Sequence, residues 1–124
     1  MRDLEELSHR WWDWQVAGWD AAGLRLVADN DLTYHHSVEV TFVDVAWAAC
    51  ADLFHHPVFR PATPAEREFA RQVTADETHH VFAWDAETAA GTVTMMVVAQ
   101  SVRIAADFVR RPDQDAPSGA TPGR

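Results

Sequence analysis

The chain has 124 residues, 48% of them hydrophobic, and a formal net charge of −9. This length is enough for one domain with its own core, and no apolar run approaches the roughly 20 residues that span a bilayer. The negative charge argues against nucleic acid, whose phosphates it would repel, and favours a basic protein partner. All ten basic residues are arginines. Schiff-base catalysis and P-loop phosphate binding are excluded, because each needs a lysine amine.

The expected location is the cytoplasm, with no membrane association. The first ten residues carry acids where a secretory signal needs a basic end and an apolar run. Cys50 is the single cysteine, so an internal disulfide is excluded and a reducing compartment fits.

Residues 3–29 predict a short helical lead-in over 3–9 and then a hairpin. The hairpin pairs roughly 11–19 with 24–29, because both segments alternate apolar and polar residues and the turn signal of residues 20–23 lies between them. An alternative stays open: Leu4, Leu7, Trp11 and Trp14 are spaced as one helical face. On that reading, a helix continues through Ala17.

Residues 31–50 predict the longest strand, around which the core is organised. Five side chains share one face on a two-residue period, and they are Tyr34, His36, Val38, Val40 and Phe42. Asp44 is the predicted site of a bulge or bend. The strand should therefore expose its other face and turn its apolar face inward.

The second half of the chain predicts one helix and two more strands. Residues 54–61 are expected to be irregular, because two prolines within five residues do not fit a strand ladder. Thr63 and Glu66 form a capping box around a helix from Pro64 to about Val73. Strands are expected over 79–85 and 92–108, with a phase slip near residues 100–101.

These elements predict a mainly β (α+β) fold. We expect one β-rich domain over residues 1–109, built as a curved antiparallel sheet, small sandwich or partly open barrel of about six strands. Its one short helix lies near residues 64–73. Residues 110–124 hold three prolines, two glycines and no large apolar side chain, and are expected to be a disordered tail.

Four of the six tryptophans fall within nine residues: Trp11, Trp12, Trp14 and Trp19. If Trp12 and Trp14 pack inward, Trp11 and Trp19 lie on the opposite face of the strand. Tryptophan is enriched at binding hot spots, so we predict that these four residues bind a protein partner or a second copy of the chain. The alternative is a second core layer.

Six of the seven histidines form adjacent pairs. One from each pair, His36, His55 and His80, would make a site for a divalent metal such as zinc, if the three segments converge. Tyr34, His36 and His80 would serve as acid and base on a small ligand. No metal-ligand spacing motif supports the metal site, so we expect no cofactor, and the histidines are equally explained as solvated or hydrogen-bonded side chains. Cys50 lies among alanines and is expected to be an inert thiol.

In general character the chain resembles two classes of small acidic β-rich bacterial proteins, toxin-neutralising immunity proteins and small-ligand barrels. We expect a non-enzymatic binding domain that recognises a protein partner, or itself, through an aromatic surface. The alternative is a small-molecule or metal-binding barrel that uses inward-facing His and Tyr residues. An enzymatic role is part of this alternative.

Overall fold

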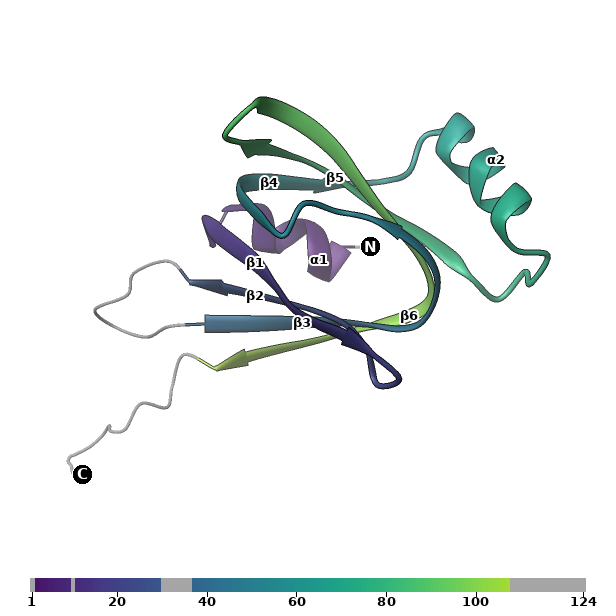
Figure 1. The fold of residues 1–124 in the computed structure, drawn as a ribbon, viewed down its shortest axis with the longest axis horizontal. Helices are drawn as coiled ribbons and strands as arrows, with labels where there is room; N and C mark the ends of the chain where they lie inside the picture. The colour runs from purple at the N-terminus through teal and green to yellow at the C-terminus, as the bar shows by residue number, and fades with distance from the viewer. Residues whose placement is uncertain (1, 10, 30–36, 108–124) are drawn as a thin grey trace.

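The computed structural model describes residues 2–9, 11–29 and 37–107. The chain folds as a mainly β domain whose six antiparallel strands close into an uneven ring, in the order β1-β2-β3-β6-β5-β4 (Figure 1). The predicted fold class is confirmed. The elements are α1 (Arg2–Glu6), the 3-10 turn η1 (Leu7–His9), β1 (Asp13–Asp20), β2 (Gly23–Asp29), β3 (Ser37–Ala49), β4 (Leu53–Arg60), α2 (Pro64–Val73), β5 (His80–Thr88) and β6 (Gly91–Asp107).

The predicted first hairpin is confirmed as β1 and β2, which pair from Asp13↔Asp29 to Asp20↔Gly23. The Asp20 carboxylate accepts a hydrogen bond of 2.8 Å from the Ala22 backbone N–H, which fixes the turn. Gly23 has φ +130°, and a Cβ there would lie 2.4 Å from the Phe42 carbonyl oxygen. Only glycine fits this turn.

The structure confirms a helical lead-in followed by a strand, and the alternative of a helix through Ala17 is wrong. Helical structure ends by His9, and the strand begins at Asp13. The four residues of the proposed helical face are nevertheless all buried, namely Leu4, Leu7, Trp11 and Trp14. The helical turns bury the two leucines and the residues that follow bury the two tryptophans, so burial of all four does not require one continuous helix. Among the described residues, neither helix has the length and apolarity to cross a membrane.

β3 and β6 are the two long strands, and each curves from one side of the ring to the other (Figure 1). Val38, Val40 and Phe42 are fully buried, as predicted. Tyr34 and His36 lie outside the described residues, as does the expected tail over 110–124.

The predicted bulge or bend at Asp44 is a bend that leaves the register unchanged, and the bulge itself lies two residues later, where the register shifts between Val45 and Trp47. The predicted phase slip lies opposite the bend, since Ala99 is buried while Gln100 and Ser101 are both exposed. The ladder passes from Val43↔Ser101 to Val45↔Ala99, and Asp44 has φ 57°. The two sequence signals mark one irregularity, which bends both strands together.

The expectation that residues 54–61 are irregular is wrong. Residues 53–60 form β4, and Pro57 lies in a bulge where the register jumps from His55↔Glu87 to Val58↔Asp85. A bulged residue does not have to donate to the ladder, so proline is tolerated there. His56 in the same bulge has φ 49°.

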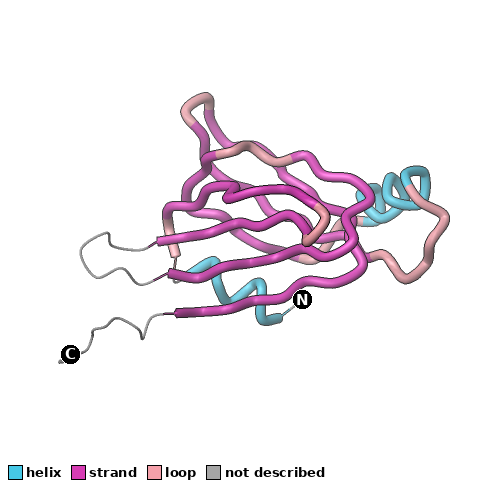
Figure 2. Tube along the Cα trace, turned by 60° about the horizontal axis from the view of Figure 1, so that its bottom comes forward, coloured by secondary structure: helices cyan, strands magenta, loops and turns pink. Residues whose placement is uncertain are grey.

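An aromatic cluster fills the ring. Trp84 is fully buried, with ring centroids 6.0 Å from Phe42, 5.8 Å from Phe54 and 5.2 Å from Phe59. Its indole Nε1 has no hydrogen-bond partner among the described residues. Figure 2 shows α2 at one end of the ring, opposite the end at which β2 finishes and β3 begins.

Candidate functional site

The ring is incomplete where β5 begins. β4 pairs with β5 only as far as Arg60↔Ala83, after which the chain leaves the sheet to form α2. His80, Val81 and Phe82 pair with β6, but no described strand pairs with them on their other side. Three residues of β5 are therefore a free strand edge within the described structure.

A pocket of about 960 Å³ lies along this edge. Side chains from α1, the end of β4, α2, the 74–79 loop, β5 and the bent part of β6 line it. Leu4, Phe59 and Phe82 are buried apolar residues in this lining, while Arg67 and Glu77 are exposed charged ones. A volume of this size, and a lining that combines apolar with charged residues, are typical of ligand-binding pockets.

The capping box predicted from the sequence positions α2 beside the pocket. The Glu66 backbone N–H donates to Thr63 Oγ1 at 3.1 Å, and the Thr63 backbone N–H donates to Glu66 Oε1 at 2.9 Å. Further along α2, the Phe69 ring meets Trp47 of β3 edge-on at 4.8 Å. The cap defines where the helix begins, and the aromatic contact attaches the helix to the outside of the sheet.

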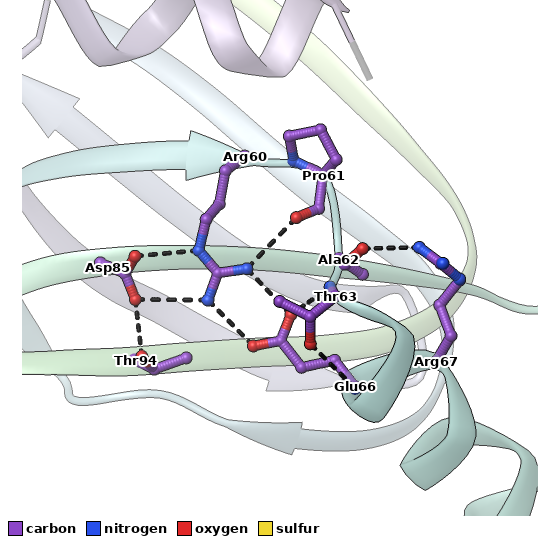
Figure 3. Close-up of polar contacts among 8 residues, drawn as sticks. All are labelled: Arg60, Pro61, Ala62, Thr63, Glu66, Arg67, Asp85 and Thr94. Atoms are coloured by element: carbon purple, nitrogen blue, oxygen red, sulfur yellow. Dashed lines mark hydrogen bonds and ion pairs between the residues drawn. The ribbon is translucent and has the colours of Figure 1, made fainter.

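Arg60 links α2 to the sheet (Figure 3). Its Nη1 and Nη2 donate to the two carboxylate oxygens of Glu66, both at 2.9 Å, and its Nε donates to Asp85 Oδ2 at 2.9 Å. Thr94 Oγ1 donates to the other Asp85 oxygen at 2.6 Å. Hydrogen bonds from Arg60 hold the pKa of Glu66 at about 2, and Arg60 together with Thr94 lowers the pKa of Asp85.

Two other arginines line the pocket from α2. Arg71 Nη1 pairs with Glu68 Oε1 at 3.2 Å, and both side chains are solvent-exposed. Arg67 Nη1 donates to the carbonyl oxygen of Ala62 at 2.6 Å. No carboxylate of the described residues lies within ion-pair distance of Arg67, so its charge is available to a ligand.

His79 lies at the end of the 74–79 loop, between that loop and β3. Its side chain is 8% exposed, with Nδ1 3.2 Å from Asp76 Oδ2 and Nε2 3.8 Å from Asp44 Oδ2. The Asp76 carboxylate also accepts hydrogen bonds from the Thr78 backbone N–H and hydroxyl. The imidazole ring therefore lies between a carboxylate of this loop and Asp44 of β3, and its buried Nδ1 has no well-formed hydrogen bond within the described residues.

The structure does not bring together His55 and His80, two ligands of the alternative metal site. His55 is opposite Glu87, seven residues from His80 along β5, a separation of ~23 Å along the strand. His55 Nδ1 instead lies 2.9 Å from Asp13 Oδ1. His36 is not among the described residues, and within those no group of three His, Cys, Asp or Glu side chains is placed to hold a metal ion.

Of the proposed acid and base residues, His80 lines the pocket, with its ring 6.4 Å from that of Phe82. Tyr34 and His36 lie outside the described part of the chain. Cys50 is half-buried, and burial, followed by the charge of Asp52, raises the pKa of its thiol to about 12. This thiol is protonated at neutral pH and is a poor nucleophile.

The four predicted partner-binding tryptophans divide into two buried and two exposed residues. Trp14 is buried, stacks on Phe54 at 6.1 Å, and donates from Nε1 to the carbonyl oxygen of buried Trp11 at 3.0 Å. Trp12 and Trp19 are 51% and 57% exposed. The arrangement with Trp12 inward is wrong, because Trp12 precedes the first residue of β1 and does not follow the alternation of the strand.

Sequence reasoning missed Arg60, Arg67 and the free edge of β5 as parts of a site. The capping box identified where α2 begins, but Arg60 reaches Asp85 across 25 residues. No pattern of residue spacing within one segment indicates a contact between residues so far apart in the sequence. The point at which β4 and β5 stop pairing is equally invisible in the pattern of either strand.

Comparison with known proteins found no family model that matches the chain, no matching curated protein and no matching solved structure.

Proposed function

We propose that the protein is a non-enzymatic binding domain that takes its ligand in the pocket beside the free edge of β5. The observation that carries this proposal is the pocket itself, with a volume of about 960 Å³ and buried apolar residues beside exposed charged ones. Such a lining fits a ligand that is partly apolar and carries a few polar groups. The proposal keeps the expected binding role and moves the site from the tryptophan cluster to the pocket.

Two basic side chains beside the pocket lie against carboxylates of the protein, which supports a role in ligand binding. Arg60 is engaged by Glu66 and Asp85, and His79 lies between Asp44 and Asp76. These groups position α2 and the 74–79 loop, and they make the walls of the pocket. A pocket whose walls are held this way is preorganised for its ligand, which lowers the entropy lost on binding.

The test uses 8-anilinonaphthalene-1-sulfonate, a probe with apolar rings and one anionic group, whose fluorescence rises in apolar surroundings. We expect saturable binding at one site. Ser101→Trp places a large side chain at an exposed position of the lining and should abolish that binding. Thr92→Trp adds a similar ring to an exposed position of the same strand outside the lining and is the matched control.

Two results would contradict the proposal. One is the absence of saturable binding by the folded wild-type protein. The other is equal binding by Ser101→Trp and Thr92→Trp, which would place the probe elsewhere. Circular dichroism of both variants establishes that each is folded.

The exposure of Trp12 and Trp19 favours a second candidate, a contact surface for a basic protein partner. Indole rings half in water are typical of interfaces, and the charge of −9 complements a basic surface. Acrylamide quenching of Trp12→Phe and Trp19→Phe, with and without a cationic test protein such as cytochrome c, checks it. Unchanged accessibility of both indoles in the mixture would count against this surface.

A further inference from the structure

We propose that the ligand of this pocket is an extended peptide segment that pairs with His80–Phe82 as an added strand. The inference rests on the proposed function, because it assigns a ligand class to the same pocket. It follows from the backbone at the edge, from the two faces of β5 and from the charge on α2.

Successive residues in a strand direct their N–H and C=O groups alternately to the neighbour on one side and on the other. Three consecutive residues that pair only with β6 therefore direct at least one N–H and one C=O into the space that β4 vacates after Arg60. The backbone of another extended segment has donors and acceptors at the spacing needed to satisfy them.

The two faces of β5 define what the side chains of the added strand would meet. Phe82 is on the buried face, and Phe59 and Leu4 line the same pocket. Residues opposite one another in adjacent strands share a face. The peptide residue opposite Phe82 should accordingly be apolar.

Val81 is on the other face of β5, which α2 covers. Val81 pairs with Val98 of β6, which pairs on its other side with Trp47 of β3. The Trp47 ring in turn contacts the Phe69 ring of α2. A peptide residue opposite Val81 thus points to the α2 side of the pocket, which Arg67 lines.

The charged residues of the pocket determine which position of the bound peptide can be acidic. Arg67 has no carboxylate partner among the described residues, so an acidic side chain opposite Val81 would pair with it. An acidic side chain near His79 would instead meet Asp76 and Glu77, which line that end of the pocket. We therefore expect an apolar residue adjacent to an acidic one in the bound segment.

The first measurement is NMR-detected amide hydrogen exchange in the free full-length chain. We expect alternation over residues 80–82, with amides that face β6 protected and those that face the pocket exchanging fast. Protection of all three amides would overturn the proposal, because it would mean that another part of the chain already covers the edge. So would sedimentation as a dimer that loses this protection on dilution.

The second measurement uses displayed random linear heptapeptides as the probe, followed by a synthetic copy of the selected sequence. We expect the peptide to displace the anilinonaphthalene dye and to protect the fast amides of residues 80–82. Its affinity should fall about 10-fold in Arg67→Gln, the loss of one charge-assisted contact. Arg25→Gln should leave it within about 2-fold, because that arginine lies outside the pocket lining and its exposed side chain pairs with Glu39.

An N-methylated copy of the peptide tests the backbone contact directly. Methylation of the amide that pairs with β5 should remove binding, whereas methylation of the next amide should not. Equal binding of both copies, or selection of no peptide by a protein that binds the dye, would refute strand pairing and leave the pocket function intact. Failure of the dye to bind would refute the pocket function itself.

Discussion

The contact between Arg60 and Glu66 is the most testable feature of the structure. The perturbation is Glu66→Gln, which removes the negative charge and keeps an amide oxygen to accept the Thr63 N–H of the capping box. The Glu66 side chain is 17% exposed and that of Arg60 is 24% exposed, so solvent screens their pairing only in part.

The magnitude follows from proton linkage. Arg60 holds the pKa of Glu66 at about 2 against an ordinary 4.5, and one pKa unit corresponds to 1.36 kcal/mol, which gives an upper limit of ~3 kcal/mol at pH 7. Because hydrogen bonds to charged groups typically contribute 1.5–3 kcal/mol, we expect Glu66→Gln to lower the free energy of unfolding by ~2 kcal/mol. A depressed pKa stabilises the fold above pH ~4.5, and this contribution is lost as the pH falls toward 2.

The assay is urea unfolding followed by tryptophan fluorescence, at pH 7 and at steps down to pH 2. Arg60→Met and the double variant complete a double-mutant cycle. Glu68→Gln, which breaks the exposed pair with Arg71, is the control and should cost less than ~0.5 kcal/mol. A coupling between Arg60 and Glu66 below that value, or the same acid sensitivity in Glu66→Gln as in wild type, would refute the reasoning.

Three further predictions concern the core, the turns and the cysteine. Trp14→Phe should destabilise the fold by ~1 kcal/mol more than Trp84→Phe in urea unfolding, because only the Trp14 indole N–H makes a hydrogen bond; an equal loss would contradict this. Gly23→Ala should lower the melting temperature more than Gly91→Ala, since both have positive φ but only the first new Cβ meets a backbone atom; the reverse order would be evidence against that turn geometry. The Cys50 thiol, with its pKa at about 12, should react with dithionitrobenzoate at pH 8 only after unfolding; fast labelling of the native protein would argue against its burial.

Local patterns predicted most elements correctly. The helix over residues 64–73 followed from Thr63, Pro64 and Glu66, and the first hairpin followed from two alternating segments around an Asp-to-Gly turn. Both signals depend on residues that are close together in the sequence. They are therefore readable without knowledge of the fold.

Predictions that depended on contacts between distant segments were less accurate. The alternative metal site required three histidine-bearing segments to converge, but the register of β4 and β5 places His55 and His80 far apart. The alternation of β1 pointed Trp12 inward, yet the strand begins one residue later. β4 was missed because a proline forbids a ladder only where a partner needs its N–H, and a bulge removes that need.

The sequence by itself determined the β-rich class, the capped helix, the inward face of Val38, Val40 and Phe42, and the bend at Asp44, because periodicity, caps and turn residues act over a few positions. Only the tertiary structure decided that the strands close into a ring, that Arg60 joins α2 to β5, and that a pocket lies where β4 departs. Ring closure and pocket both arise from pairings between residues distant in the chain. No single segment encodes such a pairing.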